Sequence, residues 1–539
     1  MAKQQKKAEK EITLETILWN CRVVLRGIGG NEKNRDAVMG LVFLKFAGDK
    51  FEKRRAEIMA EHGDIKAFLE KPSFYGSKNV FYLPNECRWE WLVANASATD
   101  IAVKIDNAMR DIVEKNPALK GALPQGFYVS LGATQRDLKK LIDEINRIDQ
   151  RKFHEADLIG RVYEYFLQTF AVAATKEEGE FYTPASLVDL IAELIEPYEG
   201  IVYDPCCGTG GMFVQSHKFV ERHHGNRRKI SIYGQERNPE TRRLARLNLA
   251  VRGISHNLGE ENGELQSTFT DDRHEGVTVD FIMANPPFNL KGWRGEDELT
   301  KDHRWRGYAV PPVSNANFAW ILHMISKLDV TNGIAGFLLA NGALNGNGEE
   351  GKIRKQLIEN DKVEAIIVLP RDMFYTTDIS VTLWIVNNNK KKARTLNGRK
   401  IRNRKDEVLF VDLRRWNSNQ EAYKLDGGST KKKVILTEEQ IEKVRDLYFA
   451  WQTGEGYEDI AELCKSATKA DIEKQNYSLA PSKYIEFIDR DLEIDYDKEM
   501  KRIQGEMSAI IELEKVSQEL LKTAFEGIGY PLGGKDEKS

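Results

Sequence analysis

Cysteine is scarce in this chain, and the few cysteines that occur are not spaced as pairs. An odd number of cysteines without CxxC spacing argues against a disulfide framework and against the common zinc sites, so we expect no metal. The same scarcity predicts a reduced, cytoplasmic protein. The five cysteines are Cys21, Cys87, Cys206, Cys207 and Cys464.

Long apolar runs and an excess of one charge are also missing. No stretch approaches the roughly 18 apolar residues of a membrane-spanning helix, and residues 1–15 lack the apolar core of a secretory signal. We therefore expect no membrane contact. The chain has 80 Lys and Arg against 83 Asp and Glu, for a net charge of -3. A nucleic-acid-binding face would have to be local or supplied by a partner.

What the chain does have is length and a change of pattern near residue 150. The region 1–150 is expected to be a helical domain, with periodic apolar positions that break at a glycine-rich loop, 27–31. Over 151–475, short apolar runs alternate with helical stretches, which predicts an open α/β sheet with helices on both faces. The expected strands are 201–203, 230–233, 281–284, 335–339, 363–368 and 382–386. The expected helices include 137–151, 158–173, 184–194, 237–252, 317–328 and 353–360.

Two further segments have a distinct composition. The stretch 390–405 is basic and poor in apolar residues, and we interpret it as a loop. The region 476–539 is expected to be a helical tail that docks on another helix, because its apolar residues recur at three- and four-residue intervals. That apolar seam comprises Met500, Ile503, Met507, Ile510, Leu513, Leu520 and Leu521.

A glycine-rich loop follows the first expected strand, with the sequence Asp204-Pro205-Cys206-Cys207-Gly208-Thr209-Gly210-Gly211. Glycines let a ligand approach the backbone closely, although a tight strand-to-helix turn would also explain them. The loop has no Gly-Lys-Ser/Thr of a P-loop, and its dinucleotide pattern is incomplete. Its acidic start, Asp204, favours a ligand that carries a positive sulfonium and an amino group over a pyrophosphate.

Acidic residues follow the loop at two places. Glu236 ends the second strand, where a carboxylate can bind both hydroxyls of a ribose, or where it is simply solvated. Asp271 or Asp272 could reach the adenine amine of a cofactor, and Asp271 is preferred.

The tetrapeptide Asn285-Pro286-Pro287-Phe288 comes directly after the third expected strand. Two prolines fix the backbone and remove two donors, so the Asn285 side-chain oxygen and the Pro286 carbonyl can both accept bonds from an NH₂ group. That grip localises the lone pair of the nitrogen for attack on a methyl group. Phe288 offers a face on which a flipped base can stack. A rigid strand-ending turn is the alternative.

The segment 289–311 interleaves basic and aromatic side chains, as phosphate contact and base stacking require. A solvated loop is an equally good explanation. The residues concerned are Lys291, Trp293, Arg294, Lys301, Arg304, Trp305 and Arg306.

These motifs resemble the modification subunit of type I restriction-modification systems, within the N6-adenine amino-methyltransferase family. The resemblance covers nearly the whole chain, and it includes the segments 18–46, 179–184, 369–375 and 476–484. It implies a Rossmann-like sheet that binds S-adenosyl-L-methionine, between an N-terminal helical domain and the tail. Glu180 departs from the family, in which Gln is common. By resemblance and chemistry together, the cofactor-binding residues are Glu180, Phe181, Tyr182, Thr183, Pro184, Ala185, Asp204, Gly208, Thr209, Gly210, Gly211, Glu236 and Asp271.

The resemblance also implies partners. Family members act on double-stranded DNA with a separate specificity subunit, to which two copies of the modification subunit bind, and a restriction subunit can join. The chain shows no recognition domain of its own, so the tail is expected to contact the specificity subunit. Two other functions fit the motifs: methylation of cytosine N4 or a protein glutamine, and a catalytically silent scaffold.

A helix is expected to follow the cofactor segment. At its start, Thr183 suits the N-cap and Pro184 the first helical position.

Overall fold

A computed structural model describes residues 13–148, 165, 183–259, 267–374, 379–424, 430–488 and 496–530. The chain divides into two compact units, Met1–Ile485 and Glu486–Ser539. The first unit contains both the N-terminal helices and the sheet, and it extends about ten residues beyond the expected start of the tail. Segment 476–485 packs inside it, where the Tyr484 ring stacks on Phe410 with 4.1 Å between centroids.

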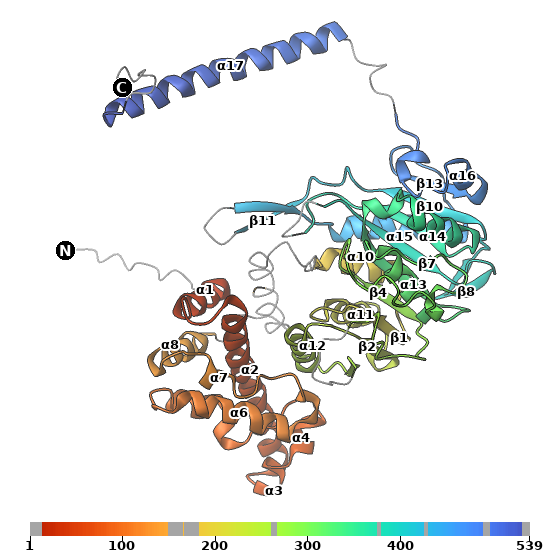
Figure 1. The fold of residues 1–539 in the computed structure, drawn as a ribbon. Helices are drawn as coiled ribbons and strands as arrows, with labels where there is room; N and C mark the ends of the chain where they lie inside the picture. The colour runs from red at the N-terminus through yellow and green to blue at the C-terminus, as the bar shows by residue number, and fades with distance from the viewer. Residues whose placement is uncertain are drawn as a thin grey trace. The chain divides into compact units, whose positions relative to one another are not determined.

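The N-terminal part is helical, as predicted (Figure 1). Its helices bury one continuous apolar cluster, which Leu244 and Leu247 of a later helix join. Thr134 forms a capping box with Asp137, so the last of these helices begins two residues before the predicted start. The helices are α1 Leu14–Val24, α2 Asn31–His62, α3 Lys66–Leu69, α4 Pro72–Gly76, α5 Trp89–Ala94, α6 Ile101–Lys115, α7 Phe127–Ser130 and α8 Gln135–Asn146.

The rest of the first unit is built on a nine-stranded sheet in the order β13-β10-β6-β7-β5-β4-β1-β2-β3. All six expected strands are present, and β3, β10 and β13 were missed. Only β7 and β13 run antiparallel to their neighbours. The strands are β1 Gly200–Asp204, β2 Ile230–Gly234, β3 His256–Asn257, β4 Phe281–Ala284, β5 Ile334–Ala340, β6 Val363–Val368, β7 Val381–Asn387, β10 Glu407–Asp412 and β13 Cys464–Thr468.

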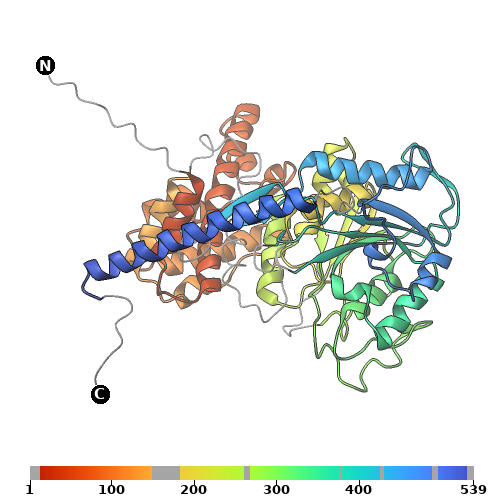
Figure 2. The same ribbon diagram turned by 90° about the horizontal axis from the view of Figure 1, so that it is seen from above.

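Helices cover both faces of this sheet, which confirms the predicted layers. Figure 2 shows one group above the sheet and the other below it, and each group shares its own apolar core with the sheet. The first group is α10 Ala185–Ile195, α11 Gly211–Arg222, α12 Pro239–Val251 and α15 Glu438–Thr453. The second group is α13 Asn317–Lys327, α14 Gly348–Glu359 and α16 Lys469–Lys474.

The strand order reverses at β1. From β1 the chain proceeds outward through β2 and β3, and it then returns to place β4 on the other side of β1. In open α/β sheets, ligands bind beyond the carboxyl ends of the strands at such a switch point. The glycine-rich loop follows β1 and the tetrapeptide follows β4, so both lie there.

Two local predictions are wrong. The basic stretch 390–405 contains a hairpin, β8 Arg394–Leu396 with β9 Arg399–Ile401, because its charged side chains find partners in the folded protein. Helix α10 is capped by Pro184 and not by Thr183, whose side chain is engaged elsewhere. A second hairpin joins β11 Gln420–Lys424 to β12 Thr430–Val434. The expected helix 158–173 lies outside the described residues, apart from Tyr165.

The second unit contains one long helix, α17 Tyr496–Gly527. Every residue of the predicted apolar seam on it is exposed within the unit. Among the described residues, no helix is long and apolar enough to span a membrane.

Candidate active site

The glycine-rich loop is fixed by backbone hydrogen bonds to the end of β2. The Gln235 amide donates to the Asp204 carbonyl at 3.0 Å, and the Cys207 amide donates to the Gln235 carbonyl at 2.9 Å. Gly210 has a φ of 81°, a left-handed conformation that favours glycine, where it caps α11. No heavy atom lies within 4 Å of a Cβ built on Gly208 or Gly211. The backbone there is open to a ligand.

Asp204 lies beneath this loop, 2% exposed. Its carboxyl accepts a hydrogen bond from the Cys206 amide at 3.0 Å. Burial raises the pKa of Asp204 to about 7, because no cation offsets the loss of solvent in this part of the described structure. Burial likewise raises the pKa of the Cys206 and Cys207 thiols well above their usual value, so neither is suited to act as a thiolate nucleophile.

Glu236 joins the loop to the second strand. One carboxylate oxygen accepts from the Gly208 amide at 2.9 Å, and the other accepts from the Asn238 amide at 2.8 Å. The side chain is therefore buried and oriented, which excludes the alternative of a solvated carboxylate at the strand end.

The two aspartates that were expected to compete differ in their surroundings. Asp272 forms an ion pair with Lys327 at 2.5 Å and also accepts from the His274 amide. Asp271 is more exposed and pairs with Arg273 at 2.7 Å. The Gln235 side chain donates to the Asp271 carbonyl at 2.7 Å, which holds this residue beside the end of β2. Asp271 therefore has the more accessible side chain of the two, and its contact with the cofactor adenine stays a prediction.

Asn285 stands at the end of β4, and its side chain is held from the cofactor segment. The amide nitrogen donates to the Thr183 hydroxyl at 2.9 Å. This bond joins two residues far apart in sequence and decides which way the Asn285 amide faces. Pro286 and Pro287 follow with a rigid backbone that has no amide donors.

Phe288 is buried against a segment that follows β6. Its ring meets that of Phe374 edge to face, with 6.1 Å between centroids. Leu369 and Met373 are buried in the same cluster. In this conformation the Phe288 ring is not an open platform, so stacking of a base on it stays a prediction.

The segment 289–311 differs from its prediction. Its two tryptophans and two of its arginines are buried, because the rings pack in the core and both guanidinium groups bind main-chain carbonyls. They are therefore not available for base stacking or phosphate contact. The exposed cations are Lys291, Lys301 and Arg306.

Several residues that shape this site were missed by sequence reasoning. Gln235 and Phe374 were among them, and so was Asn248, which donates to the Thr209 carbonyl at 2.8 Å. The sequence signal available for Gln235 was its position directly before Glu236, at the end of the second expected strand. Of the expected cofactor residues, Glu180, Phe181 and Tyr182 lie outside the described residues. Among those described, no group of three or more His, Cys, Asp or Glu could hold a metal ion.

These residues fit S-adenosylmethionine. The loop backbone is open at Gly208 and Gly211, and the described residues place a buried carboxyl with no cation beside it beneath that loop. Such a site suits a ligand with positive charge. Glu236 and Asp271 lie beside this loop and the end of β2, and their contacts with a ribose and an adenine stay predictions.

Two family profiles match most of the chain. The N-6 DNA Methylase profile matches residues 154–491, and the HsdM N-terminal domain profile matches residues 14–145. The type I restriction enzyme HindI methylase subunit of Haemophilus influenzae is 40% identical over 75% of this chain and 89% of its own length. The MjaIX methylase subunit of Methanocaldococcus jannaschii is 34% identical over 96% of this chain and 91% of its own.

Solved structures share the fold. A type I restriction-modification methyltransferase subunit from Streptococcus thermophilus superposes with a TM-score of 0.68 at 24% identity, covering 88% of this chain and 99% of that one. A chain from a structure of type I R-M complex assembly gives a TM-score of 0.55 at 18% identity, covering 94% and 97%.

Proposed function

This chain belongs to the N-6 DNA methylase family, as a methylase subunit of the type I restriction-enzyme kind, and from that premise we propose how its residues divide the reaction. The reaction is transfer of a methyl group to adenine N6 in DNA. The observation that carries the proposal is the position of Asn285. It follows β4 at the switch point, beside the glycine-rich loop that follows β1, and Thr183 orients its amide.

The cofactor side of the site is formed by the loop and the acids around it. When bound, S-adenosyl-L-methionine supplies an electrophilic methyl group on a positive sulfonium. The open backbone of Gly208 and Gly211 accommodates it, with Thr209 and Gly210 between them. Asp204 supplies negative charge, Glu236 binds the ribose, and Asp271 receives the adenine amine. The resemblance assigns the segment 180–185 to cofactor binding as well, and its described residues, 183–185, lead into α10.

The tetrapeptide holds the target amine. The Asn285 side-chain oxygen and the Pro286 carbonyl each accept one hydrogen of the adenine NH₂. The nitrogen then becomes more tetrahedral, and its lone pair points toward the methyl group. Pro287 keeps the turn rigid, and Phe288 contacts the flipped base after its contact with Phe374 opens. The proton lost from the nitrogen leaves to solvent along these acceptors.

The alternatives weaken against these findings. A silent scaffold has no need of an oriented Asn285 or an open glycine backbone. Methylation of cytosine N4 or of glutamine uses a similar tetrapeptide, but the matching family is described as an N-6 DNA methylase.

The chain works with DNA and with other subunits of its system. We propose that double-stranded DNA reaches the site in a complex of two copies of this chain and one specificity subunit, to which a restriction subunit can be added. Because the substrate is cellular DNA, the complex would be cytoplasmic. The exposed seam on α17 would pack on helices of the specificity subunit.

The test of the active site is Asn285→Ala in the complex with the specificity subunit. We expect methylation of DNA to fall below detection, while calorimetry shows S-adenosylmethionine binding within about twofold of wild type. Thr183→Val serves as a graded companion, since it removes the hydroxyl that orients the Asn285 amide. Its cofactor affinity is measured alongside, because Thr183 is also an expected cofactor residue. Nucleoside analysis identifies the product. Persistent activity of Asn285→Ala, or N4-methylcytosine as the product, would contradict the proposal.

The tail is tested by two matched substitutions. Ile510→Asp places a charge on the seam, whereas Ser508→Asp places the same charge roughly 200° around the helix. We expect only Ile510→Asp to weaken co-purification of the specificity subunit. Equal retention of the specificity subunit by both variants would refute this contact.

A further inference from the structure

Two buried arginines in the segment 289–311 have similar surroundings, but their hydrogen-bond partners lie in different parts of the chain. Arg294 is 9% exposed and Arg304 is 6% exposed. Each guanidinium stacks on the neighbouring tryptophan ring, at 5.3 Å for Trp293 and 5.2 Å for Trp305. Burying a guanidinium is costly unless its donors are satisfied. The acceptors that each arginine has found therefore show what it holds together.

Among the described residues, Arg294 hydrogen-bonds only to carbonyls of its own segment. Its guanidinium donates to the carbonyls of Gly295 at 2.8 Å, Glu296 at 2.7 Å and Pro311 at 3.0 Å, with a longer bond to Glu298. These bonds close the segment on itself.

Arg304 binds outside its segment. Its guanidinium donates to the carbonyl of Thr268 at 3.3 Å and to that of Phe269 at 2.6 Å. Asp302, with two bonds at 2.7 and 2.8 Å, fixes the guanidinium and neutralises it. The carbonyls it holds belong to the stretch directly before Asp271, on the adenine side of the cofactor site.

The same guanidinium reaches β1 through a histidine. Arg304 lies 3.2 Å from His323 Nδ1, and His323 Nε2 lies 3.1 Å from the Tyr203 hydroxyl. An arginine can only donate, so Nδ1 is the acceptor and Nε2 carries the proton. Burial lowers the pKa of His323 to about 3, which keeps the ring neutral and this arrangement fixed. Tyr203 directly precedes Asp204.

A last bond completes the connection to the glycine-rich loop. The Thr268 hydroxyl donates to the Pro205 carbonyl at 2.6 Å. Arg304 therefore touches the stretch 268–269 from one side, and the glycine-rich loop holds it from the other. Both routes from the guanidinium end at Asp204 or its neighbours.

We propose that Arg304 is a positioning residue that couples the segment after the tetrapeptide to the cofactor site, so that each stabilises the other. The proposal rests on the proposed function, since it assumes that the loop and Asp271 hold S-adenosylmethionine. Coupling between two sites is reciprocal. Cofactor binding should tighten the segment 289–311, and loss of the connection should weaken cofactor binding.

The experiment compares Arg304→Gln with Arg294→Gln in the purified full chain. Calorimetry measures S-adenosylmethionine affinity, and we expect Kd to rise about tenfold for Arg304→Gln and less than about twofold for Arg294→Gln, because only the first substitution removes bonds that leave the segment. Trypsin reports the reciprocal effect through the exposed Lys291, Lys301 and Arg306. We expect the cofactor to slow cleavage there in wild type and in Arg294→Gln, and to lose that effect in Arg304→Gln.

The ratio of the cleavage rate without cofactor to the rate with cofactor distinguishes a positioning role of Arg304 from a general loss of stability in the segment. A structural role alone would speed cleavage with and without cofactor by the same factor and leave the ratio unchanged. Thr268→Val gives a second, milder route, since it removes only the bond to Pro205, and we expect about threefold weaker binding. Equal affinity and equal protection in wild type, Arg304→Gln and Thr268→Val would overturn the proposal. If wild type itself bound no S-adenosylmethionine, the proposed function would fail instead.

Discussion

Two buried carboxyl groups lie at opposite ends of the parallel strands of the sheet. One has cations beside it and the other has none among the described residues. Asp204 ends β1 at the carboxyl edge, where the candidate active site is, and Glu364 lies at the amino end of β6, which runs in the same direction. Both side chains are almost inaccessible to solvent. The protein's own cations neutralise Glu364, which therefore serves the fold. We interpret the charge of Asp204 as one that a bound ligand neutralises.

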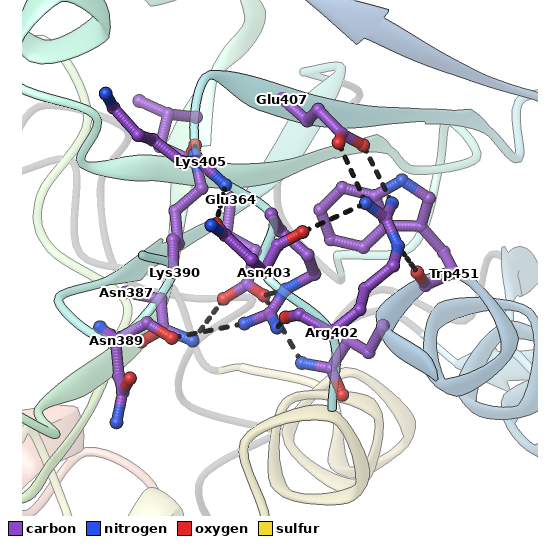
Figure 3. Close-up of polar contacts among 12 residues, drawn as sticks. Glu364, Asn387, Asn389, Lys390, Arg402, Asn403, Lys405, Glu407 and Trp451 are labelled. Atoms are coloured by element: carbon purple, nitrogen blue, oxygen red, sulfur yellow. Dashed lines mark hydrogen bonds and ion pairs between the residues drawn. The ribbon is translucent and has the colours of Figure 1, made fainter. Parts of the chain in front are cut away.

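Glu364 is fully matched by its surroundings. The Arg404 guanidinium donates to it at 2.9 Å, and both side chains are 0% exposed. Asn387 and Gln452 donate to it as well, and Lys390 beside it pairs with Asp361 at 2.6 Å (Figure 3). Burial raises the pKa of Glu364, but Arg404 and Lys390 outweigh burial and hold that pKa below its usual value. Two carboxylates and two cations neutralise one another there.

Among the described residues, Asp204 accepts hydrogen bonds from the Cys206 amide and thiol and has no cation beside it, and the nearby Glu236 raises its pKa further. A buried carboxyl in that state is strained when ionised. The molecule shows elsewhere that it can neutralise such a group completely. That contrast supports our interpretation that the missing positive charge at Asp204 comes with the cofactor.

The largest loss of stability is expected at the amino end of β6, where Glu364 is paired with cations. Glu364→Gln leaves Arg404 and Lys390 buried with one carboxylate for two cations, and we expect a loss of about 3–5 kcal/mol in the free energy of unfolding. Urea unfolding followed by circular dichroism measures it. Asp204→Asn is the matched control, because an amide can still accept from the Cys206 amide, and it should cost less than about 1 kcal/mol. Similar losses of unfolding free energy in both variants would contradict the view that the two carboxyl groups have different roles.

Next in size is the effect of Asp204→Asn on the cofactor. Removing the charge should weaken S-adenosylmethionine binding about tenfold or more, since hydrogen bonds and contacts to charged groups are the stronger ones. Calorimetry measures the affinity. Asp189→Asn is the control: burial raises the pKa of Asp189 too, but this residue already pairs with a cation, Arg222 at the end of α11. Unchanged binding in Asp204→Asn would mean that its carboxyl serves the loop alone.

The sequence predicted the active-site edge far better than the opposite one. The glycine-rich loop and Asn285-Pro286 are consecutive residues after apolar strands, so their chemistry is visible in one dimension. Their proximity follows from the strand order, which local pattern does not contain. Glu364 and Arg404 are 40 positions apart, and a basic stretch around Lys390 has the composition of a solvated loop.

Because local sequence does not show contacts between distant residues, the segment 289–311 was wrongly predicted to expose its tryptophans and arginines to nucleic acid. Its mixture of tryptophan and arginine is typical of a nucleic-acid contact, yet it is equally what a buried arginine stacked on a ring requires. Only the positions of distant acceptors, such as the carbonyls of Thr268 and Phe269, distinguish the two. Strand β3 was missed because it has two residues and no apolar run. That reason does not apply to β10, whose apolar residues 408–411 were a visible signal.

A smaller effect is a difference in pH dependence. A raised pKa in the folded state means that the contribution of Asp204 to stability is fully present below its unfolded pKa and is lost as the pH rises through about 7. Without cofactor, wild type should therefore lose stability relative to Asp204→Asn between about pH 4 and about pH 7. Urea unfolding at several pH values gives both curves. Parallel curves would show that Asp204 does not titrate in this range.

The smallest effect is expected at the rim of the matched cluster, where Arg402 holds Glu407 with two bonds at 2.7 and 2.8 Å (Figure 3). These side chains are 31% and 29% exposed, so water already screens the pair. Glu407→Gln should cost only about 0.2–1 kcal/mol in the same urea experiment. A loss as large as that of Glu364→Gln would mean that ion pairing itself stabilises this edge. A small loss would show that the cost arises from leaving Arg404 and Lys390 unmatched away from water, the condition that Asp204 meets at the other edge until a cation binds.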